Sequence, residues 1–247
     1  PGAPPRPSFL LCRPFAQEAT RTASMYRVLS DRLAREGCEV LSFDYHGTGD
    51  SPGEEAEQGL RGWVQDIVAA HEQLCQPGGP AVHWFGMGLG ATLATQAAAR
   101  VARPPAHLVL WEPVVDGARY VQALFDGHRD ELAREFSRPW GQLLRQNRAV
   151  EPHLPGDVLG FMVGATLADD LGRLSGLPLG AALRRGVRTV CVAGDEDRAA
   201  LAGLAADSGG LLTLQALETR TNWMSSQAMG SAVVPPEVPR TLLNTFS

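Results

Sequence analysis

The segment from residue 82 to residue 94 carries the clearest sign of chemistry in this sequence. It reads Val-His-Trp-Phe-Gly-Met-Gly-Leu-Gly-Ala-Thr-Leu-Ala, and Gly86, Gly88 and Gly90 follow the spacing of a nucleophile elbow, G-x-S-x-G. The central residue of such an elbow attacks the substrate, but a glycine at position 88 has no side chain that can attack. The amides after the turn, beginning with Leu89, lie at a helix N-terminus and can hold an oxyanion, carboxylate or carbonyl oxygen. A plain glycine-rich connection is the alternative.

The elements that must position this turn alternate along the chain. Short apolar runs typical of strands occupy residues 8–12, 39–44, 81–85, 107–111, 187–193 and 211–216. Apolar residues at helical spacing, with stop signals after them, cover residues 24–36, 63–74 and 91–101. This alternation predicts an α/β fold with a mostly parallel central sheet flanked by helices on both faces.

Residues 117–183 break the alternation, because the stretch is too long for a simple crossover connection. We interpret it as a helical lid inserted over the carboxyl edge of the sheet, so that residues 1–116 and 184–247 form the core. Within it, residues 118–136 are predicted to be helical. Near the end of the chain, the prolines of residues 233–239 predict an extended tail.

A second segment, Phe43-Asp-Tyr-His-Gly-Thr-Gly-Asp-Ser51, follows a predicted strand. With it, the chain resembles an α/β-hydrolase, and more closely the second type of exosortase-associated hydrolase. The strings that carry the resemblance are LLCRPFAQEA (10–19), LSFDYHGTGDS (41–51), GMGLGA (86–91), LVLWEPVVDG (108–117) and GDVLGFM (156–162). They span about residues 8–200 and imply the α/β-hydrolase fold, with Gly88 at the nucleophile position.

The resemblance also implies roles for matched positions. The loop after the first strand would supply one oxyanion-hole amide, at Phe15 or Ala16, and Leu89 would supply the other. The acid of a catalytic triad would follow the strand at residues 187–193, where Asp197 fits the usual spacing and Asp195 is the fallback. An ordinary solvated turn is the alternative for both carboxylates.

The catalytic histidine of the family would follow the last strand, but the sequence has no histidine beyond His153. An active hydrolase needs a base within hydrogen-bond reach of its nucleophile. Two triad members are therefore missing. Exchange of one serine for Gly88 would not explain the absent histidine, so we favour a naturally degenerate site over an engineered one.

Other side chains could form a different catalytic or binding site. His46 and Asp50 could form an acid–base pair near the carboxyl edge, or His46 could brace the neighbouring backbone. Glu18 lies in the expected oxyanion loop. It either faces the pocket or, as the favoured role, caps a helix or pairs with an arginine. Trp111, Phe161 and Trp223 either line an apolar pocket under the lid or belong to the core.

Composition excludes several classes of function. The 247 residues carry a net charge of −5, which argues against nucleic-acid binding. All 22 basic residues are arginine, which excludes a Schiff-base lysine and a Walker-type phosphate lysine. The four cysteines lack C-x-x-C spacing and the histidines lack metal-like pairing, so we expect no metal and no cofactor. We interpret the proline-rich start as an arm, and without an apolar run that could span a membrane we expect a cytoplasmic location.

Three functions stay open. The first is binding of a small acyl, carboxyl or thioester molecule, which an acyl carrier protein could deliver, without serine hydrolysis. The second is a non-hydrolytic enzyme for acyl transfer, cyclisation or elimination, in which His46 or Asp197 moves protons. The third is an ester or thioester hydrolase with an unrecognised nucleophile. A homodimer is also left open.

Overall fold

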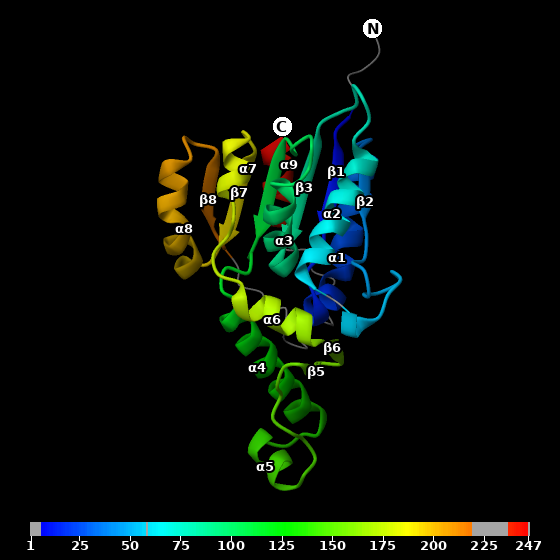
Figure 1. Cartoon of the computed structure of the whole chain (residues 1–247), viewed down its shortest axis with the longest axis vertical. Coiled ribbons are helices and arrows are strands. Elements are labelled where there is room, and N and C mark those ends of the chain that lie inside the picture. Colours follow the sequence, from blue (N-terminus) through cyan, green and yellow to red (C-terminus); the bar gives the residue numbers. More distant parts are fainter. Residues whose placement is uncertain (1–5, 58, 219–236, 247) are drawn as a thin grey trace.

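The computed structural model describes residues 6–57, 59–218 and 237–246. Its centre is a six-stranded sheet in which each pair of neighbouring strands is parallel (Figure 1), as the alternation of elements predicts. The strands are β1 (Ser8–Cys12), β2 (Glu39–Ser42), β3 (Val82–Met87), β4 (His107–Trp111), β7 (Arg188–Ala193) and β8 (Leu212–Ala216), in the order β2-β1-β3-β4-β7-β8. The strand that leads into Gly88, β3, is thus one of the two central strands.

Helices cover both faces of the sheet, because successive side chains of each strand point to opposite faces. On one face, Phe9, Phe85 and Val109 pack against α1 (Ala16–Arg35) and α9 (Glu237–Phe246). On the other face, Leu10, Trp84 and Leu108 belong to the larger core. The helices that cover it are α2 (Leu60–Leu74), α3 (Gly88–Ala98), α7 (Gly180–Arg184) and α8 (Asp195–Asp207).

The segment between β4 and α7 lies beyond the carboxyl ends of the strands (Figure 1). Its elements are α4 (Gly117–Glu135), α5 (Trp140–Arg145), the antiparallel pair β5 (Gly156–Val158) and β6 (Phe161–Val163), and α6 (Ala165–Arg173). It is tied to the core by Gln17 Nε2, which donates to Leu159 O at 3.2 Å, and by Asp170, which accepts from Leu60 N at 2.9 Å. A short 3₁₀ helix, η1 (Glu55–Glu57), lies beside β6. The role of this segment as a lid stays a prediction.

Two local predictions, and one alternative that the sequence left open, were wrong. Helix α1 begins at Ala16 rather than at residue 24, because its first turns bury small and polar residues such as Arg21 and Thr22 and so lack an apolar pattern. Residues 195–197 are not a loop but the first turn of α8, where acidic side chains interact favourably with the positive end of the helix dipole. Residues 237–239 are helical, since a proline in the first turn of a helix removes no intrahelical hydrogen bond.

Two properties of the described residues bear on function. None of the helices they form combines the length and the apolar character needed to cross a membrane. Within the same residues, no group of three or more histidine, cysteine, aspartate or glutamate side chains could hold a metal ion.

Candidate functional site

The bend between β3 and α3 is the centre of the site. Gly88 begins α3 with φ +54, a left-handed conformation that favours glycine. A Cβ atom on Gly90 would lie 2.1 Å from Arg13 O, and one on Gly86 would lie 2.6 Å from Ala91 Cα. Strand, helix and the loop after β1 can approach this closely only because both positions are glycine. The structure therefore places Gly88 on a sharp turn of elbow geometry.

Two helix N-termini meet at this turn. The residue before α3, Met87, is extended and provides no side-chain cap, and neither does Phe15 before α1. The amides of a first helical turn have no acceptor within the helix, so those of Leu89 and its neighbours are available to an oxygen atom. The loop after β1 lies directly beside the turn, because Pro14 Cβ is 3.3 Å from the position of a Cβ on Gly88. The two predicted oxyanion segments are thus neighbours.

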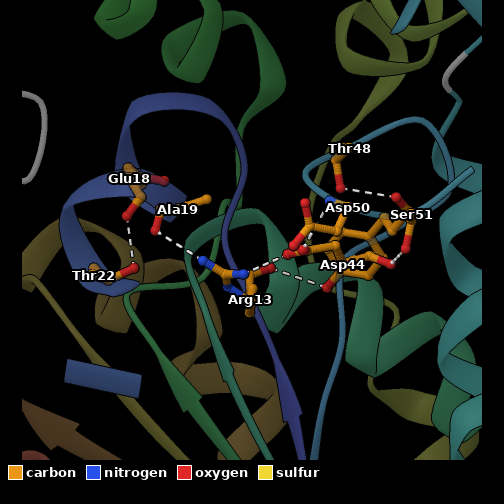
Figure 2. Close-up of polar contacts among 9 residues, drawn as sticks. Arg13, Glu18, Ala19, Thr22, Asp44, Thr48, Asp50 and Ser51 are labelled. Atoms are coloured by element: carbon orange, nitrogen blue, oxygen red, sulfur yellow. Dashed lines mark hydrogen bonds and ion pairs between the residues drawn. The ribbon is translucent and has the colours of Figure 1, made fainter. Parts of the chain in front are cut away.

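The loop after β1 is held by the segment that follows β2 (Figure 2). Arg13 forms an ion pair with Asp44 and donates to Ala19 O at 3.3 Å. Asp44 also accepts from the amide of Asp50 at 3.3 Å. From the same segment, the Tyr45 hydroxyl donates to Arg13 O at 3.0 Å. The Asp-Tyr-His-Gly-Thr-Gly-Asp-Ser string therefore holds the loop after β1 in place.

Glu18 brings a carboxyl group to the turn. Its Oε2 lies 2.7 Å from the position that a Cβ on Gly88 would take. This oxygen is buried, and it has no hydrogen-bond partner among the described residues. Burial, and then the charge of Glu112, raise the pKa of Glu18 to about 8. The favoured capping or arginine-pairing role for Glu18 was wrong, because among the described residues this carboxyl forms neither a capping hydrogen bond nor an ion pair.

Two further groups complete what we call the acid cluster, namely Glu18, Glu112 and Tyr120. Glu112 follows β4 with φ +45, and Tyr120 comes from α4. The Tyr120 hydroxyl is buried without a hydrogen-bond partner among the described residues. Its pKa is raised well above the ordinary value by burial, and then by Glu18. Sequence reasoning missed this cluster, although Glu18 and Glu112 both lie in the strings of the family resemblance.

The structure gives His46 a peripheral position. The residue is exposed, and its ring packs so closely on Gly53 that a Cβ there would lie 2.3 Å from Nε2. The His46 amide donates to Asp66 at 2.8 Å, and its carbonyl accepts from Trp63 Nε1 at 3.0 Å. No hydrogen bond joins the side chains of His46 and Asp50 within the part of the chain described. These contacts fit the bracing alternative for His46.

Asp197 is engaged by an arginine. In the first turn of α8 it forms an ion pair with Arg119 of α4, which also contacts Glu196 at 2.7 Å. Asp195 pairs with Arg198 instead, and its side chain is 96% exposed against 23% for Asp197. Of the two predicted carboxylates, Asp197 is therefore the one turned toward the inserted segment, and it binds a guanidinium rather than an imidazole.

The predicted aromatic pocket is divided in the structure. Phe15 and Phe161 have ring centroids 6.2 Å apart, and with Ala16 they line a cavity of about 170 Å³. Trp111 instead lies in the core beneath α1 and α9 and lines a separate groove of about 620 Å³. Leu89 is fully buried. Trp223 falls outside the described residues.

A family model described as serine aminopeptidase, S33, matches residues 17–154, more than half of the chain. The protein belongs to this family. Solved structures of the same α/β-hydrolase fold align over nearly the whole chain, at identities that show the fold alone. An α/β hydrolase of Sphaerobacter thermophilus has a TM-score of 0.54 at 22% identity, with 98% of this chain and 93% of that chain covered. A carboxylesterase of Nitrososphaera gargenis has a TM-score of 0.61 at 13% identity, with 98% and 89% covered. Tomato methylketone synthase I, complexed with 2-tridecanone, has a TM-score of 0.59 at 13% identity, with 99% and 100% covered.

Curated relatives match a smaller part. Uncharacterized proteins from two Mycobacterium tuberculosis strains are 41% identical over 110 residues, which is 43% of this chain and 36% of theirs. The matched segment thus spans about a third of these relatives.

The chemistry available at the turn follows from the groups that lie there. Residue 88 supplies no nucleophile, and the sequence supplies no histidine beyond His153. Backbone amides remain, together with a buried carboxyl group. Such a set can bind and polarise a carbonyl oxygen.

Proposed function

We propose that this protein holds the oxygen of an acyl, carboxyl or thioester-type molecule at the Gly88 turn without ordinary serine hydrolysis. The observation that carries the proposal is the turn itself. It keeps the elbow geometry and uncapped amides, while a carboxyl oxygen of Glu18 takes the space next to position 88. The site thus retains the means to bind a carbonyl group and lacks the means to attack it.

Other nucleophilic side chains near the turn argue in the same direction. Burial raises the pKa of the Cys12 thiol far above its ordinary value, so the reactive thiolate does not form. Thr92 is fully buried, and its hydroxyl donates to Val114 O at 2.8 Å. Neither group meets the requirement for an activated nucleophile beside a base.

The structural neighbours are compatible with a carbonyl ligand. One of them is a carboxylesterase, and another was solved with 2-tridecanone, a neutral ketone. At their low identity they support only the statement that this fold can accommodate such molecules. Delivery by an acyl carrier protein, homodimerisation, a cytoplasmic location and the lid role of residues 117–183 stay predictions.

Two measurements test the proposal. A serine-directed fluorophosphonate and p-nitrophenyl butyrate should give neither labelling nor turnover above the buffer rate. Titration with 2-nonanone, a neutral carbonyl probe, should shift the amide resonances of Leu89 and Gly90 in a ¹H–¹⁵N spectrum. Labelling of any residue would instead support the hydrolase with an unrecognised nucleophile. Unchanged amide resonances would contradict the proposed binding site.

A non-hydrolytic enzyme is the second candidate, favoured by the buried carboxyl beside amides that could stabilise an enolate. In this case Glu18, rather than His46 or Asp197, would accept a proton from the carbon next to the carbonyl group. The C–H electron pair would form the C=C bond of an enolate while the π pair of the C=O bond moves onto the oxygen. Return of a deuteron from solvent to the carbon would restore the ketone. Exchange of the C3 protons of 2-nonanone in D₂O, followed by NMR and lost in Glu18→Ala, would favour this candidate over simple binding.

A further inference from the structure

We infer that Glu18 is the group that selects the ligand: as an uncharged acid it donates a hydrogen bond to a neutral carbonyl compound, an ester, thioester or ketone, and the site rejects free carboxylates. This inference rests on the proposed binding at the Gly88 turn and narrows its ligand class.

The position of the carboxyl group is the first argument. Glu18 Oε2 and Cδ lie 2.7 and 3.5 Å from the position of a Cβ on Gly88, and Pro14 closes the same space at 3.3 Å. This is where the side chain of a nucleophile would begin in a hydrolytic relative. A ligand oxygen held by the first-turn amides of α3 would therefore lie within hydrogen-bond range of Glu18.

Two buried polar groups without hydrogen-bond partners are the second argument. Glu18 Oε2 and the Tyr120 hydroxyl are both buried and have no partner among the described residues. A buried polar group without a partner loses its hydration and gains no hydrogen bond in return, so such groups call for an explanation. A carboxylic acid and a phenol both need an acceptor for their proton. A ligand carbonyl oxygen has two lone pairs, so it can accept from a first-turn amide of α3 and from one of these two donors.

Charge is the third argument. The groups coupled electrostatically to Glu18 are Glu112, Tyr120 and Tyr26, which are acidic or neutral. The Tyr26 hydroxyl donates to Cys12 O at 2.9 Å, so its proton is not directed at Glu18.

The arginines around the cluster are engaged elsewhere. Arg13 pairs with Asp44, Arg21 with Glu131, and Arg119 with Asp197. A free carboxylate would thus enter a buried site next to acids, with the surrounding guanidinium groups already matched by carboxylates. Burying an unmatched charge is far costlier than burying a hydrogen-bonded neutral group. The raised pKa of Glu18, about 8, agrees with an uncharged acid at neutral pH.

Two isosteric probes separate the ligand classes, because octanoate differs from 2-nonanone only by an O⁻ in place of a methyl group. Isothermal titration calorimetry at pH 6.5 should show 2-nonanone binding about tenfold or more tightly than octanoate. At pH 9.5, where Glu18 is ionised, affinity for 2-nonanone should fall by about tenfold or more. Equal or tighter binding of octanoate, or a ketone affinity that does not change with pH, would overturn the inference.

Variants assign the effect to Glu18. Glu18→Gln keeps a hydrogen-bond donor that cannot ionise, so it should bind 2-nonanone at both pH values alike. Glu18→Ala should lose about tenfold in affinity at pH 6.5. Glu135→Gln, which changes an exposed carboxylate on α4, is the matched control and should behave as the wild type. Pronounced pH dependence that persists in Glu18→Gln would contradict the role given to this residue.

The two proposals fail in different ways. If neither probe binds, the proposed carbonyl site at Gly88 is wrong, and so is the ligand selection that rests on it. If the ketone shifts the Leu89 amide but ¹³C NMR shows the Glu18 carboxyl titrating near 4.5, only the role of Glu18 is wrong. A melting curve for each variant excludes loss of binding through unfolding.

Discussion

Gly88 and Glu18 meet at the turn between β3 and α3, where we propose that a ligand carbonyl group binds. The glycine keeps the backbone in a left-handed turn, and the carboxyl oxygen lies against its Cα where a Cβ would project. Burial keeps this acid protonated because its charged form would lose hydration without gaining a cation. At the scale of single residues, the site is therefore a proton donor and a set of amides.

Gly88→Ser should not restore hydrolysis. The new Cβ would lie 2.7 Å from Glu18 Oε2, and no imidazole follows His153 in the sequence. A serine is strained in the left-handed backbone conformation of residue 88, so the substitution should also lower the free energy of unfolding by roughly 1–2 kcal/mol. Hydrolysis of p-nitrophenyl butyrate at the wild-type rate, with a lowered melting temperature, is the expected result. A serine that reacts with a fluorophosphonate would reveal a base that we have not identified.

Gly90→Ala should be the more damaging change at the turn. A Cβ there would meet the backbone oxygens of Arg13 and Cys12 at 2.1 and 2.6 Å, atoms that cannot move aside. Overpacking of this kind should cost about 3 kcal/mol. Gly203→Ala is the control, because it lies in α8 with open space around it and should stabilise by about 0.5–1 kcal/mol. Urea denaturation measures both values, and equal stability of the two variants would contradict the close packing of the turn.

At the scale of elements, helix α4 links the inserted segment to the core on two sides. Through Arg119 it reaches the first turn of α8, and through Glu131 it reaches Arg21 of α1. The two contacts differ in burial, since the Arg119 side chain is 43% exposed and that of Arg21 is 1% exposed. The same helix carries Tyr120 into the acid cluster, so its docking also positions part of the site.

These two ion pairs should contribute unequally to stability. Arg119→Gln should lower the free energy of unfolding by less than about 1 kcal/mol, because exposed pairs gain little over hydration. Glu131→Ala should cost about 2–3 kcal/mol, because it removes the carboxylate that faces a buried guanidinium. Thermal and urea denaturation of both variants check this order. A larger loss in Arg119→Gln would mean that the contact between α4 and α8 holds the inserted segment.

At the scale of the whole molecule, one buried group in strand β3 and another in helix α1 give the free energy of unfolding opposite dependences on pH. Burial lowers the pKa of His83 from 6.5 to about 4 and raises that of Glu18 from 4.5 to about 8. Below pH 6.5 the unfolded chain takes up a proton at His83 that the folded chain refuses, so stability falls with acid. Above pH 4.5 the unfolded chain releases a proton at Glu18 that the folded chain keeps, so stability falls with base.

Glu18→Gln should therefore change the shape of the pH–stability curve. In the wild type the two effects oppose each other between pH 4.5 and 6.5, and Glu18 alone should remove about 2 kcal/mol between pH 6.5 and 8. The variant should lose this alkaline decline and should weaken more steeply toward acid. Urea denaturation at intervals from pH 4.5 to 8.5 tests this. Parallel curves for the two proteins would show that the Glu18 carboxyl titrates normally in the folded state.

Local patterns in the sequence were sufficient for the architecture. Alternating apolar runs and helical spacings predicted six strands of a parallel sheet, and the spacing of Gly86, Gly88 and Gly90 predicted the turn between β3 and α3. These features can be predicted locally, because the patterns that indicate a buried strand or a glycine turn lie within a few neighbouring residues. The start of α1 was missed because Arg21 and Thr22 are polar residues that only tertiary packing buries.

The composition of the site was decided by tertiary contacts. Nothing near Glu18 in the sequence indicates that its carboxyl meets Gly88, or that Glu112 and Tyr120 from distant elements lie close enough to alter its ionisation. Likewise, the pairing of Asp197 with Arg119 and the position of His46 against Gly53 depend on how helices and loops meet. Side-chain burial and charge coupling arise between elements far apart along the chain, so the sequence alone determined the scaffold, and only the folded structure decided which groups face the turn.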